Sequence, residues 1–249
     1  MGIRLIQGDC LEVMQSLPSN SVDLIICDLP YGVTHNSWDK PLDLAALWTQ
    51  YNRIAKVQAP ILLFATGKFL IELGASNLKD YRHKIVWHKT MCTGFLNASR
   101  APLRAHEDIL VFYRKAPKFN RVYIDNVGEP YVRVRIREED RSGRCYGKMS
   151  SDPVVSKSDS SRLSTDVLKF SKDNCRTATN GTAKPVALLE HLMRMYSDEG
   201  MTVLDNCLGS GSTAIAAHNT NRNFIGIELH QPMLDAAKQR LDKLGITYD

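Results

Sequence analysis

The sequence predicts an α/β fold: a mostly parallel sheet with an antiparallel pair of strands at one edge and an insert in the middle of the chain. Two observations support this prediction. Apolar runs of strand length alternate with segments of helical period, and a glycine-rich turn joins a late strand to a helix. With 249 residues, of which 43% are hydrophobic and 24% charged, the chain can bury one large core.

The first half alternates strands with helices as far as residue 80. The expected elements are a strand at 3–7, a helix capped by Asp9, a strand at 22–27, a helix at 42–57, a strand at 60–65 and a helix at 66–77. Two further strands, at 81–88 and 108–113, are separated by a long loop at 91–102 and by no clear helix. Such strands favour an antiparallel pair, which we place at one edge of the sheet.

The tetrapeptide Asp28-Leu29-Pro30-Tyr31 directly follows the strand at 22–27, where Pro30 should end that strand. In open α/β sheets, ligands bind at the carboxyl ends of the strands. A carboxylate, a proline carbonyl and an aromatic ring can accept hydrogen bonds from an amino group and stack on a flat ring, which suits an extruded nucleobase. The alternative is a capping Asp beside a turn Pro. Trp38, in the loop that follows, could stack on a nucleotide or cover the next helix.

The middle of the chain is strongly basic. Residues 114–148 contain ten Lys and Arg against five Asp and Glu, a net +5 that equals the charge of the whole chain. A strand at 131–137 would place Arg133, Arg135 and Arg137 on one face, and Arg121 lies in the same region. Arginines in a row match phosphates and guanine edges, although a solvated hairpin is the alternative. Residues 150–164 are rich in Ser and Asp and are expected to form a mobile loop or part of a specificity lobe.

The final third supplies the remaining strands and a glycine-rich turn. The expected elements are a helix from Pro185, a strand at 201–205, the turn at 206–213, a helix at 214–218, a strand at 223–228 and a helix from Pro232. A dinucleotide-binding turn would carry a third glycine at position 214, after Gly209 and Gly211, but Ala214 stands there.

Two carboxylates flank this turn. Asp205, at its start, suits a cationic ligand such as the amino-acid end of S-adenosylmethionine better than a pyrophosphate. Glu228, at the end of the next strand, is placed to bind a ribose diol. A turn of purely structural role remains the alternative.

Cysteine spacing and hydropathy exclude other classes. The six cysteines form no C-x-x-C pair and no metal-ligand spacing, so we expect no metal and reduced thiols. No apolar run approaches the roughly 18 residues that cross a membrane, and no signal segment is recognisable at the N-terminus. We therefore expect a cytoplasmic protein without a membrane partner.

Together the motifs resemble the β class of the S-adenosylmethionine-dependent DNA amino-methyltransferases. The matching segments are Asp28–Tyr31, Gly94–Asn97, His106–Leu110, Lys184-Pro185, Asp205–Thr213 and Phe224–Glu228, in the order of that class; the second and third are similar to phage and prophage members. The resemblance implies a Rossmann-like methyltransferase fold, circularly permuted, with a seven-stranded sheet. It also implies a catalytic half at 1–115, a target-recognition insert at 116–181 and a cofactor-binding half at 182–249.

The resemblance assigns site residues by position. Those implied are Asp28, Pro30 and Tyr31 for catalysis, and Asp9, Cys10, Asp28, Lys184, Asp205, Cys207, Gly209, Ser210, Gly211, Thr213 and Glu228 for the cofactor. For DNA contact we expect Trp38, Arg121, Arg133, Arg135 and Arg137, on the grounds of stacking and charge given above. The sequence departs from the family at Leu29, where proline is common, and at Asn206-Cys207, where Pro-Phe is common.

The implied reaction is methyl transfer to the exocyclic N6 amine of a flipped adenine in double-stranded DNA, because an Asp at the first position of the tetrapeptide resembles the adenine members. Cytosine-N4 is the first alternative, and RNA adenine or a glutamine amide is a less favoured one. From another class, the chain could be a catalytically silent nucleic-acid-binding relative. The β-class members often dimerise, so a homodimer is a further expectation.

Overall fold

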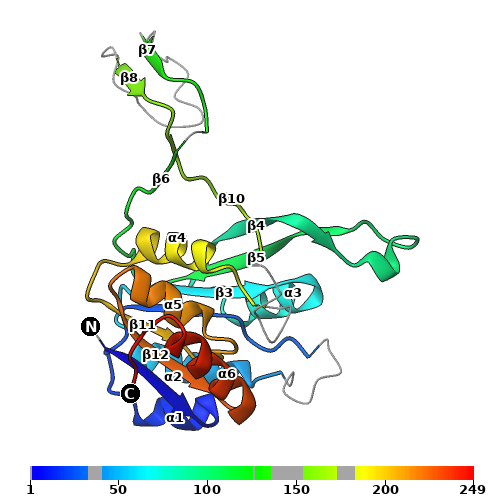
Figure 1. Ribbon diagram of the computed structural model, residues 1–249, viewed down its shortest axis with the longest axis vertical. Helices are drawn as coiled ribbons and strands as arrows, with labels where there is room; N and C mark the ends of the chain where they lie inside the picture. The colour runs from blue at the N-terminus through cyan, green and yellow to red at the C-terminus, as the bar shows by residue number, and fades with distance from the viewer. Residues whose placement is uncertain (1, 33–40, 126, 136–153, 173–182) are drawn as a thin grey trace. The chain divides into compact units, whose positions relative to one another are not determined.

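The computed structural model describes residues 2–32, 41–125, 127–135, 154–172 and 183–249 (Figure 1). Contacts between Cα atoms divide the chain into two compact units. The larger comprises Met1–Asn120 and Asp166–Asp249, and the smaller comprises Arg121–Thr165. Strands from both ends of the sequence meet in the larger unit, so the polypeptide leaves this unit once and returns to it.

An eight-stranded sheet forms the centre of the larger unit. In spatial order its strands are β1 (Ile3–Gln7), β12 (Asn223–Glu228), β11 (Thr202–Asp205), β2 (Leu24–Cys27), β3 (Ile61–Ala65), β5 (Arg104–Phe112), β4 (Tyr81–Thr93) and β10 (Val167–Phe170). Only β5 runs antiparallel to its two neighbours; all other pairs are parallel. The predicted mostly parallel α/β sheet is confirmed.

The strand order shows the circular permutation directly. β11, from the C-terminal part, lies between β12 and β2, with Val203 opposite Leu24 and Leu204 opposite Ile25. The two ends of the chain are adjacent, because the Leu5 amide donates to the Asp249 carbonyl at 2.9 Å and the Asp249 amide donates to the Ile3 carbonyl at 2.9 Å. Figure 1 marks both termini at the same margin of the sheet. Joining them would give an unpermuted order of strands.

Two predictions about the sheet were wrong. It has eight strands instead of seven, because β10 pairs in parallel with β4, with Val167 opposite Val86. For the same reason, the antiparallel pair of β4 and β5 does not form the edge of the sheet. β4 also continues to Thr93, so the predicted loop at 91–102 belongs partly to a long ribbon of β4 and β5.

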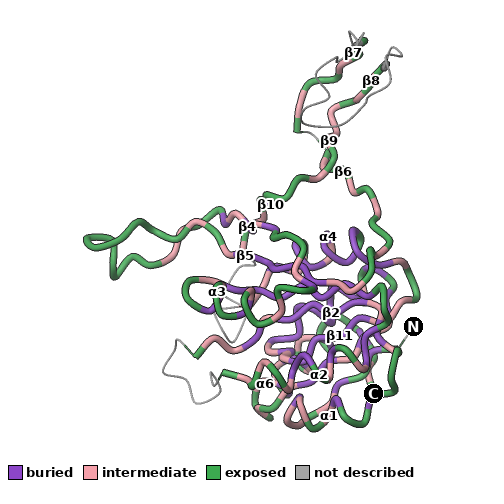
Figure 2. Tube along the Cα trace, turned by 180° about the vertical axis from the view of Figure 1, so that it is seen from behind, coloured by how far each residue is buried: buried purple, intermediate pink, exposed green. Residues whose placement is uncertain are grey.

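Six helices cover the two faces of the sheet. They are α1 (Cys10–Ser16), α2 (Leu44–Ile54), α3 (Gly67–Ser76), α4 (Val186–Tyr196), α5 (Ser212–Asn219) and α6 (Gln231–Asp242). The first three share one core with Ile25, Cys27 and Leu63 of the central strands. Because side chains alternate along a strand, Leu24 and Ile26 point to the opposite face, where α4 packs on α5 and α6 on β12. Buried residues concentrate in these layers (Figure 2).

Asp9 caps α1 as predicted, by accepting from the Leu11 amide at 2.8 Å. The structure adds a second cap, Asp43, which accepts from the Ala45 amide at the start of α2 at 2.9 Å. Pro185 is the N-cap residue of α4, where its missing N–H leaves no donor unsatisfied.

The smaller unit consists of two short ribbons. β6 (Tyr123–Ile124) pairs with β9 (Arg162–Leu163), and β7 (Tyr131–Arg135) pairs with β8 (Val154–Ser158), all antiparallel. The loop predicted over 150–164 was therefore wrong at 154–158 and 162–163, which form β8 and β9, and residues 150–153 lie outside the described residues. Among the described residues, no helix is long and apolar enough to span a membrane.

Candidate active site at the carboxyl edge of the sheet

Four chain segments converge at one edge of the sheet. β1, β12, β11 and β2 are parallel neighbours, so the acidic residues at or just after their carboxyl ends, Asp9, Glu228, Asp205 and Asp28, all lie at the same edge. From β11 the chain continues through α5 to β12, which lies on one side of β11. From β2 it continues through α2 to β3, which lies on the other side. The direction in which strands are added to the sheet therefore reverses between β11 and β2. Such a switch point is where open α/β sheets bind ligands.

The turn from Asp205 to Thr213 has a backbone that glycine makes possible. Gly209 and Gly211 have φ of 55° and 80°, in the left-handed region that side chains disfavour. A Cβ on Gly211 would also lie 3.1 Å from the Cβ of Ala237 in α6. The Gly209 amide donates to Glu228 Oε2 at 2.8 Å, which ties the turn to the end of β12. The predicted cofactor residues Gly209, Gly211 and Glu228 therefore form one local structure.

Asp205 is a buried carboxylate at the start of this turn. Its Oδ2 accepts from Thr213 Oγ1 at 2.6 Å and its Oδ1 from the Cys207 amide at 3.0 Å. Burial raises the pKa of Asp205 to about 6, although both hydrogen bonds act to lower it. The side chain is thus held in place, and no Lys, Arg or His among the described residues forms a salt bridge with it.

Three cysteine thiols are hydrogen-bonded together at the turn. Cys10, at the start of α1, and Cys27, at the end of β2, hydrogen-bond with Cys207. Burial is the largest cause that raises the pKa of Cys27, to about 12, and a hydrogen bond with Cys207 also raises the pKa of Cys10. The raised pKa values keep all three thiols neutral at physiological pH, so they contribute packing and supply no nucleophile. Ser210 adds backbone support, since its carbonyl accepts from Arg240 Nη1 at 3.2 Å.

The tetrapeptide after β2 presents its carboxylate and ring together. Tyr31 donates its hydroxyl to Asp28 Oδ1 at 2.5 Å, and its ring stacks on Phe69 of α3 with centroids 5.0 Å apart and planes inclined by 28°. Burial and the Asp28 carboxylate raise the pKa of Tyr31 well above its ordinary value, so the hydroxyl stays protonated. Pro30 lies between them, partly buried.

Lys184 joins the two halves of the chain at this point. Its Nζ donates to Asp28 Oδ2 and lies 3.3 Å from Glu107 Oε2, and its side chain is only 10% exposed. Burial would lower the pKa of Lys184, but the Asp28 and Glu107 carboxylates overcome this and raise it. Lys184 is therefore a cation held against the carboxylate of the tetrapeptide.

Glu107 and Lys89 complete a chain of charges that sequence reasoning missed. Lys89 Nζ lies 2.5 Å from Glu107 Oε1, and burial of Glu107 is outweighed by Lys184 and Lys89, which lower its pKa. The signal for Lys89 was present: Ile85, Trp87 and Lys89 fall on one face of β4, and a lysine on a buried face requires a partner. We call Lys89, Glu107, Lys184, Asp28 and Tyr31 the carboxyl-edge network.

Two of the predicted DNA-contacting residues belong to the smaller unit. Arg121 and Arg133 are exposed there, and the Arg133 guanidinium lies 5.1 Å from the centroid of the Tyr131 ring. Trp38, Arg137 and the side chain of Arg135 are outside the described residues. Asp9 is near the cofactor turn in the sheet order, but its carboxylate caps α1. Among the described residues, no group of His, Cys, Asp or Glu could hold a metal ion.

A permuted Rossmann-like sheet, with an acidic glycine turn and an Asp–Tyr pair at the same edge, defines a nucleoside-binding α/β protein of the methyltransferase class. Comparison with known proteins agrees. The N6/N4 methyltransferase family, described as DNA methylase, matches residues 22–239, and the chain belongs to this family.

Among curated relatives, the type II methyltransferase M.HpaI of Haemophilus parainfluenzae is 28% identical over 259 residues, covering 97% of this chain and 75% of that protein. M1.MboII of Moraxella bovis is 28% identical and covers 96% of both. Two solved structures share the fold. M1.HpyAVI, crystallised as a SAM complex, is 22% identical with a TM-score of 0.61 over 96% of this chain and 100% of that one. The cytosine-N4-specific PvuII DNA methyltransferase is 14% identical with a TM-score of 0.68 over 96% and 86%.

Proposed function

We propose that this DNA methylase transfers a methyl group from S-adenosylmethionine to the N6 amine of an adenine flipped out of double-stranded DNA. The observation that carries the proposal is the juxtaposition of two segments at one sheet edge. The glycine turn with Asp205 and Glu228 follows β11 and β12, and the Asp28–Tyr31 pair follows β2, the direct neighbour of β11.

The turn suits this cofactor by its donor set. Asp205 is buried and forms no salt bridge with any described residue, so a cationic ligand would offset the cost of burial that its raised pKa reflects. Glu228 accepts one backbone N–H at each oxygen, from Gly209 at 2.8 Å and from His230 at 2.9 Å, and retains lone pairs for ribose hydroxyls. Gly209 places no side chain over the turn. When bound, the cofactor supplies a methyl group on a sulfonium sulfur, which an amine can attack.

Asp28 and the Pro30 carbonyl would accept the two hydrogens of the target amine. The lone pair of an aromatic amine is delocalised into its ring, and hydrogen bonds that pull the nitrogen toward a tetrahedral shape make the lone pair available. Lys184 and Tyr31 hold the Asp28 carboxylate in one orientation, and the proton released from the amine leaves to Asp28 or to water. Phe69 occupies one face of the Tyr31 ring, so a flipped base would stack on the other face.

The choice of adenine rests on Asp28, because the resemblance associates an Asp at this position with adenine-N6 and a Ser with cytosine-N4. The cytosine-N4 alternative is kept because the PvuII methyltransferase, named as cytosine-N4-specific, shares the fold. The same proposal includes three further parts. Residues 116–181 form the target-recognition insert, and the protein forms a homodimer. The side chains that hold the DNA are Arg121, Arg133, Arg135, Arg137 and Trp38.

One experiment tests the reaction and the base together. The purified protein is incubated with isotopically labelled S-adenosylmethionine and plasmid DNA from a methylation-free host, and the DNA is then digested to nucleosides. The label should appear in N6-methyl-2′-deoxyadenosine. Label in N4-methyl-2′-deoxycytidine would show that the target is cytosine instead, and label in neither would support a silent nucleic-acid-binding relative.

The variant Asp28→Ala should abolish the label while cofactor binding by calorimetry stays within about threefold of wild type, since Asp28 acts on the target amine. Asp235→Ala, at an exposed position on α6, is the matched control and should leave activity intact. Retained activity in Asp28→Ala would refute the role of Asp28.

A further inference from the structure

The β4–β5 ribbon extends well beyond the layers of the larger unit. We call residues 90–106 the ribbon arm; it contains the end of β4, a turn and the start of β5. Figure 1 shows it projecting away from the helices, and Figure 2 shows it exposed along most of its length. It lies within the larger unit and is distinct from the basic insert that the sequence favoured for DNA contact.

The tip of the ribbon arm has a defined shape of its own. Gly94 has φ of 94°, and the 3₁₀ turn Phe95–Asn97 follows it. Successive backbone hydrogen bonds close the tip: the Asn97 amide donates to the Gly94 carbonyl at 2.9 Å, and the Ala98 amide donates to the Phe95 carbonyl at 3.1 Å. These local bonds fix the tip before any partner arrives, so a partner need not order it.

Several large apolar side chains of this arm are largely exposed. Met91 is 69% exposed, Phe95 65% and Leu96 100%. Single exposed apolar residues are ordinary on protein surfaces, but several on one projecting element indicate a surface that meets a partner.

The charge of the ribbon arm suits an anionic partner. Residues 90–106 contain no Asp or Glu, while Arg100 and Arg104 are exposed there. Proteins that enter the DNA duplex combine arginines for the phosphates with Phe, Leu or Met wedges that part the bases. An apolar tip between basic flanks has this composition.

The base of the ribbon arm lies at the candidate active site. β4 is parallel to β2 and β11, so it leaves the sheet at the same carboxyl edge as Asp28 and Asp205. Lys89 and Glu107 stand just below the arm on β4 and β5, and Glu107 and Asp28 both contact Lys184. An element anchored beside the tetrapeptide can reach the DNA from which a target base is drawn.

From this geometry we propose that the ribbon arm is a DNA-contacting wedge: Arg100 and Arg104 bind phosphates, and Phe95 and Leu96 enter the duplex and support the unstacked target base. The inference rests on the proposed function and adds a partner surface to it. The arm lowers the cost of extruding the base, so its effect should depend on whether that base is paired.

The phosphate contacts can be measured without knowing the recognition sequence. Binding to a labelled duplex of about 30 base pairs and arbitrary sequence is followed by anisotropy over a range of salt. Arg100→Ala/Arg104→Ala should weaken binding and reduce the salt slope by about 2, one for each lost phosphate contact. Arg4→Ala/Lys243→Ala removes two exposed cations elsewhere and should leave the slope nearer to wild type. Equal slopes in the two variants would refute the phosphate contacts.

The wedge is tested on the site that sequencing of the methylated plasmid identifies. Phe95→Ala/Leu96→Ala should slow single-turnover methylation of the paired duplex by about tenfold or more. The rate should return to within about threefold of wild type when the target base faces an abasic position, since that base is already unpaired. Leu244→Ala, at an exposed apolar position outside the arm, serves as the control. Equal losses on both duplexes, or no loss, would overturn the wedge.

Two other outcomes are distinguishable. If sedimentation shows that Phe95→Ala/Leu96→Ala converts a dimer to a monomer while the rate on paired DNA is unchanged, the arm contacts a second copy of the chain and the proposal fails. If the wild-type protein binds DNA but transfers no methyl group, the proposed function fails instead. The ribbon arm is then judged by the salt slope, which requires no catalysis.

Discussion

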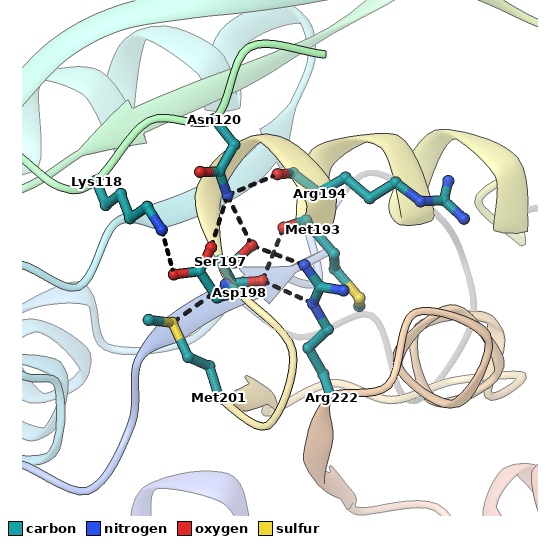
Figure 3. A network of polar contacts seen from close by, with 8 residues as sticks. All are labelled: Lys118, Asn120, Met193, Arg194, Ser197, Asp198, Met201 and Arg222. Atoms are coloured by element: carbon teal, nitrogen blue, oxygen red, sulfur yellow. Dashed lines mark hydrogen bonds and ion pairs between the residues drawn. The ribbon is translucent and has the colours of Figure 1, made fainter.

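Two buried polar networks lie at opposite ends of the sheet, and they differ in what their side chains contact. The carboxyl-edge network joins side chain to side chain, from Lys89 to Tyr31. At the amino end of the parallel strands, polar contacts surround Ser197 and Asp198, which precede β11 in the sequence (Figure 3). We call these contacts the amino-end network. There Arg222 donates to the Ser197 carbonyl at 2.7 Å, and Asn120 donates to the carbonyls of Arg194 and Ser197, each at 3.1 Å.

This difference indicates that the amino-end network stabilises the fold and the carboxyl-edge network takes part in the chemistry. Backbone carbonyls cannot move without unfolding the local chain, so a network that ends on them serves to hold α4, β11 and β12 together. Carboxylates and ammonium groups at side-chain ends can exchange partners when a ligand arrives, at the cost of keeping charges buried. The comparison predicts that substitutions at the carboxyl edge change activity and that those at the amino end change stability.

The largest effect should come from Lys184→Met. The methionine keeps the apolar stem beside Phe64 but removes the cation that faces Asp28 and Glu107. Without it, two neighbouring carboxylates repel each other and Asp28 loses its fixed orientation, so we expect the single-turnover rate to fall by about 10³-fold. A rate within about threefold of wild type would remove Lys184 from the chemistry.

A pH series gives the same variant a second readout. In the wild type, Lys184 and Lys89 overcome the effect of burial and lower the pKa of Glu107, so Glu107 stabilises the fold above its ordinary value of 4.5 and loses this contribution as the pH falls. Lys184→Met removes much of that contribution. The difference in melting temperature between wild type and variant should therefore be largest near neutral pH and narrow below about pH 4.5.

Arg222→Ala should have the next largest effect, on stability. Arg222 is buried, and its removal takes away the donor to the Thr220 carbonyl and one of the two donors to the Ser197 carbonyl, which keeps Asn120. Removing one partner of buried polar groups costs about 3 kcal/mol in the free energy of unfolding. Urea denaturation measures this loss, and kcat at low temperature should stay near wild type. A fall in kcat without a change in the urea midpoint would reverse the assignment of the two networks.

The sequence predicts a residue of these networks when the pattern that places it is local, and fails when its partners are distant in the sequence. Asp28, Asp205 and Glu228 could be placed because each follows an apolar strand, and parallel strands end at one edge. Glu107 could not, because its place beside Lys184 requires the order of β3, β5 and β4 and the register that sets it opposite Trp87. Local patterns carry no information on either.

The fold shows the same limit. Strands of branched apolar residues such as β2 and β3 were predicted, because burial on both faces excludes polar side chains from them. β10 and β8 were missed: only Leu168 of β10 is fully buried, and β8 pairs on one side with β7. Their strand conformation comes from partners distant in sequence. The permuted order was expected from the family resemblance and is confirmed by β11 lying beside β2.

A smaller effect of opposite sign is expected for Asp205→Asn. Burial raises the pKa of Asp205 to about 6 from its ordinary 3.8, so the folded state holds the proton more tightly than the unfolded state. The carboxylate therefore costs stability above pH 6, and the cost disappears as the pH falls to about 4. The amide should stabilise the protein at pH 7 by less than the roughly 3 kcal/mol to which this shift corresponds, because it weakens the bonds from Thr213 and the Cys207 amide, and by little near pH 4.

The same substitution should weaken cofactor binding by about tenfold or more at pH 7, because the amide cannot neutralise a cation. In the wild type, cofactor affinity should fall as the pH drops through about 6, since protonation of Asp205 removes its charge. Calorimetry at several pH values measures both. Stabilisation without loss of affinity would show that Asp205 does not face the cofactor.

Lys118→Met, the same chemical change as Lys184→Met, should have the smallest effect. Lys118 Nζ lies 2.7 Å from Asp198 Oδ2, but the Lys118 side chain is 67% exposed. Water and salt screen such a pair, so its loss should cost about 0.5 kcal/mol in the free energy of unfolding and nothing in kcat. The neighbouring bonds from Asn120 to Asp198 Oδ1 and to the Ser197 carbonyl would remain in place. A loss as large as that of Arg222→Ala would mean that the amino-end network depends on its exposed charge and not on its buried donors, and urea denaturation of the two variants side by side decides between them.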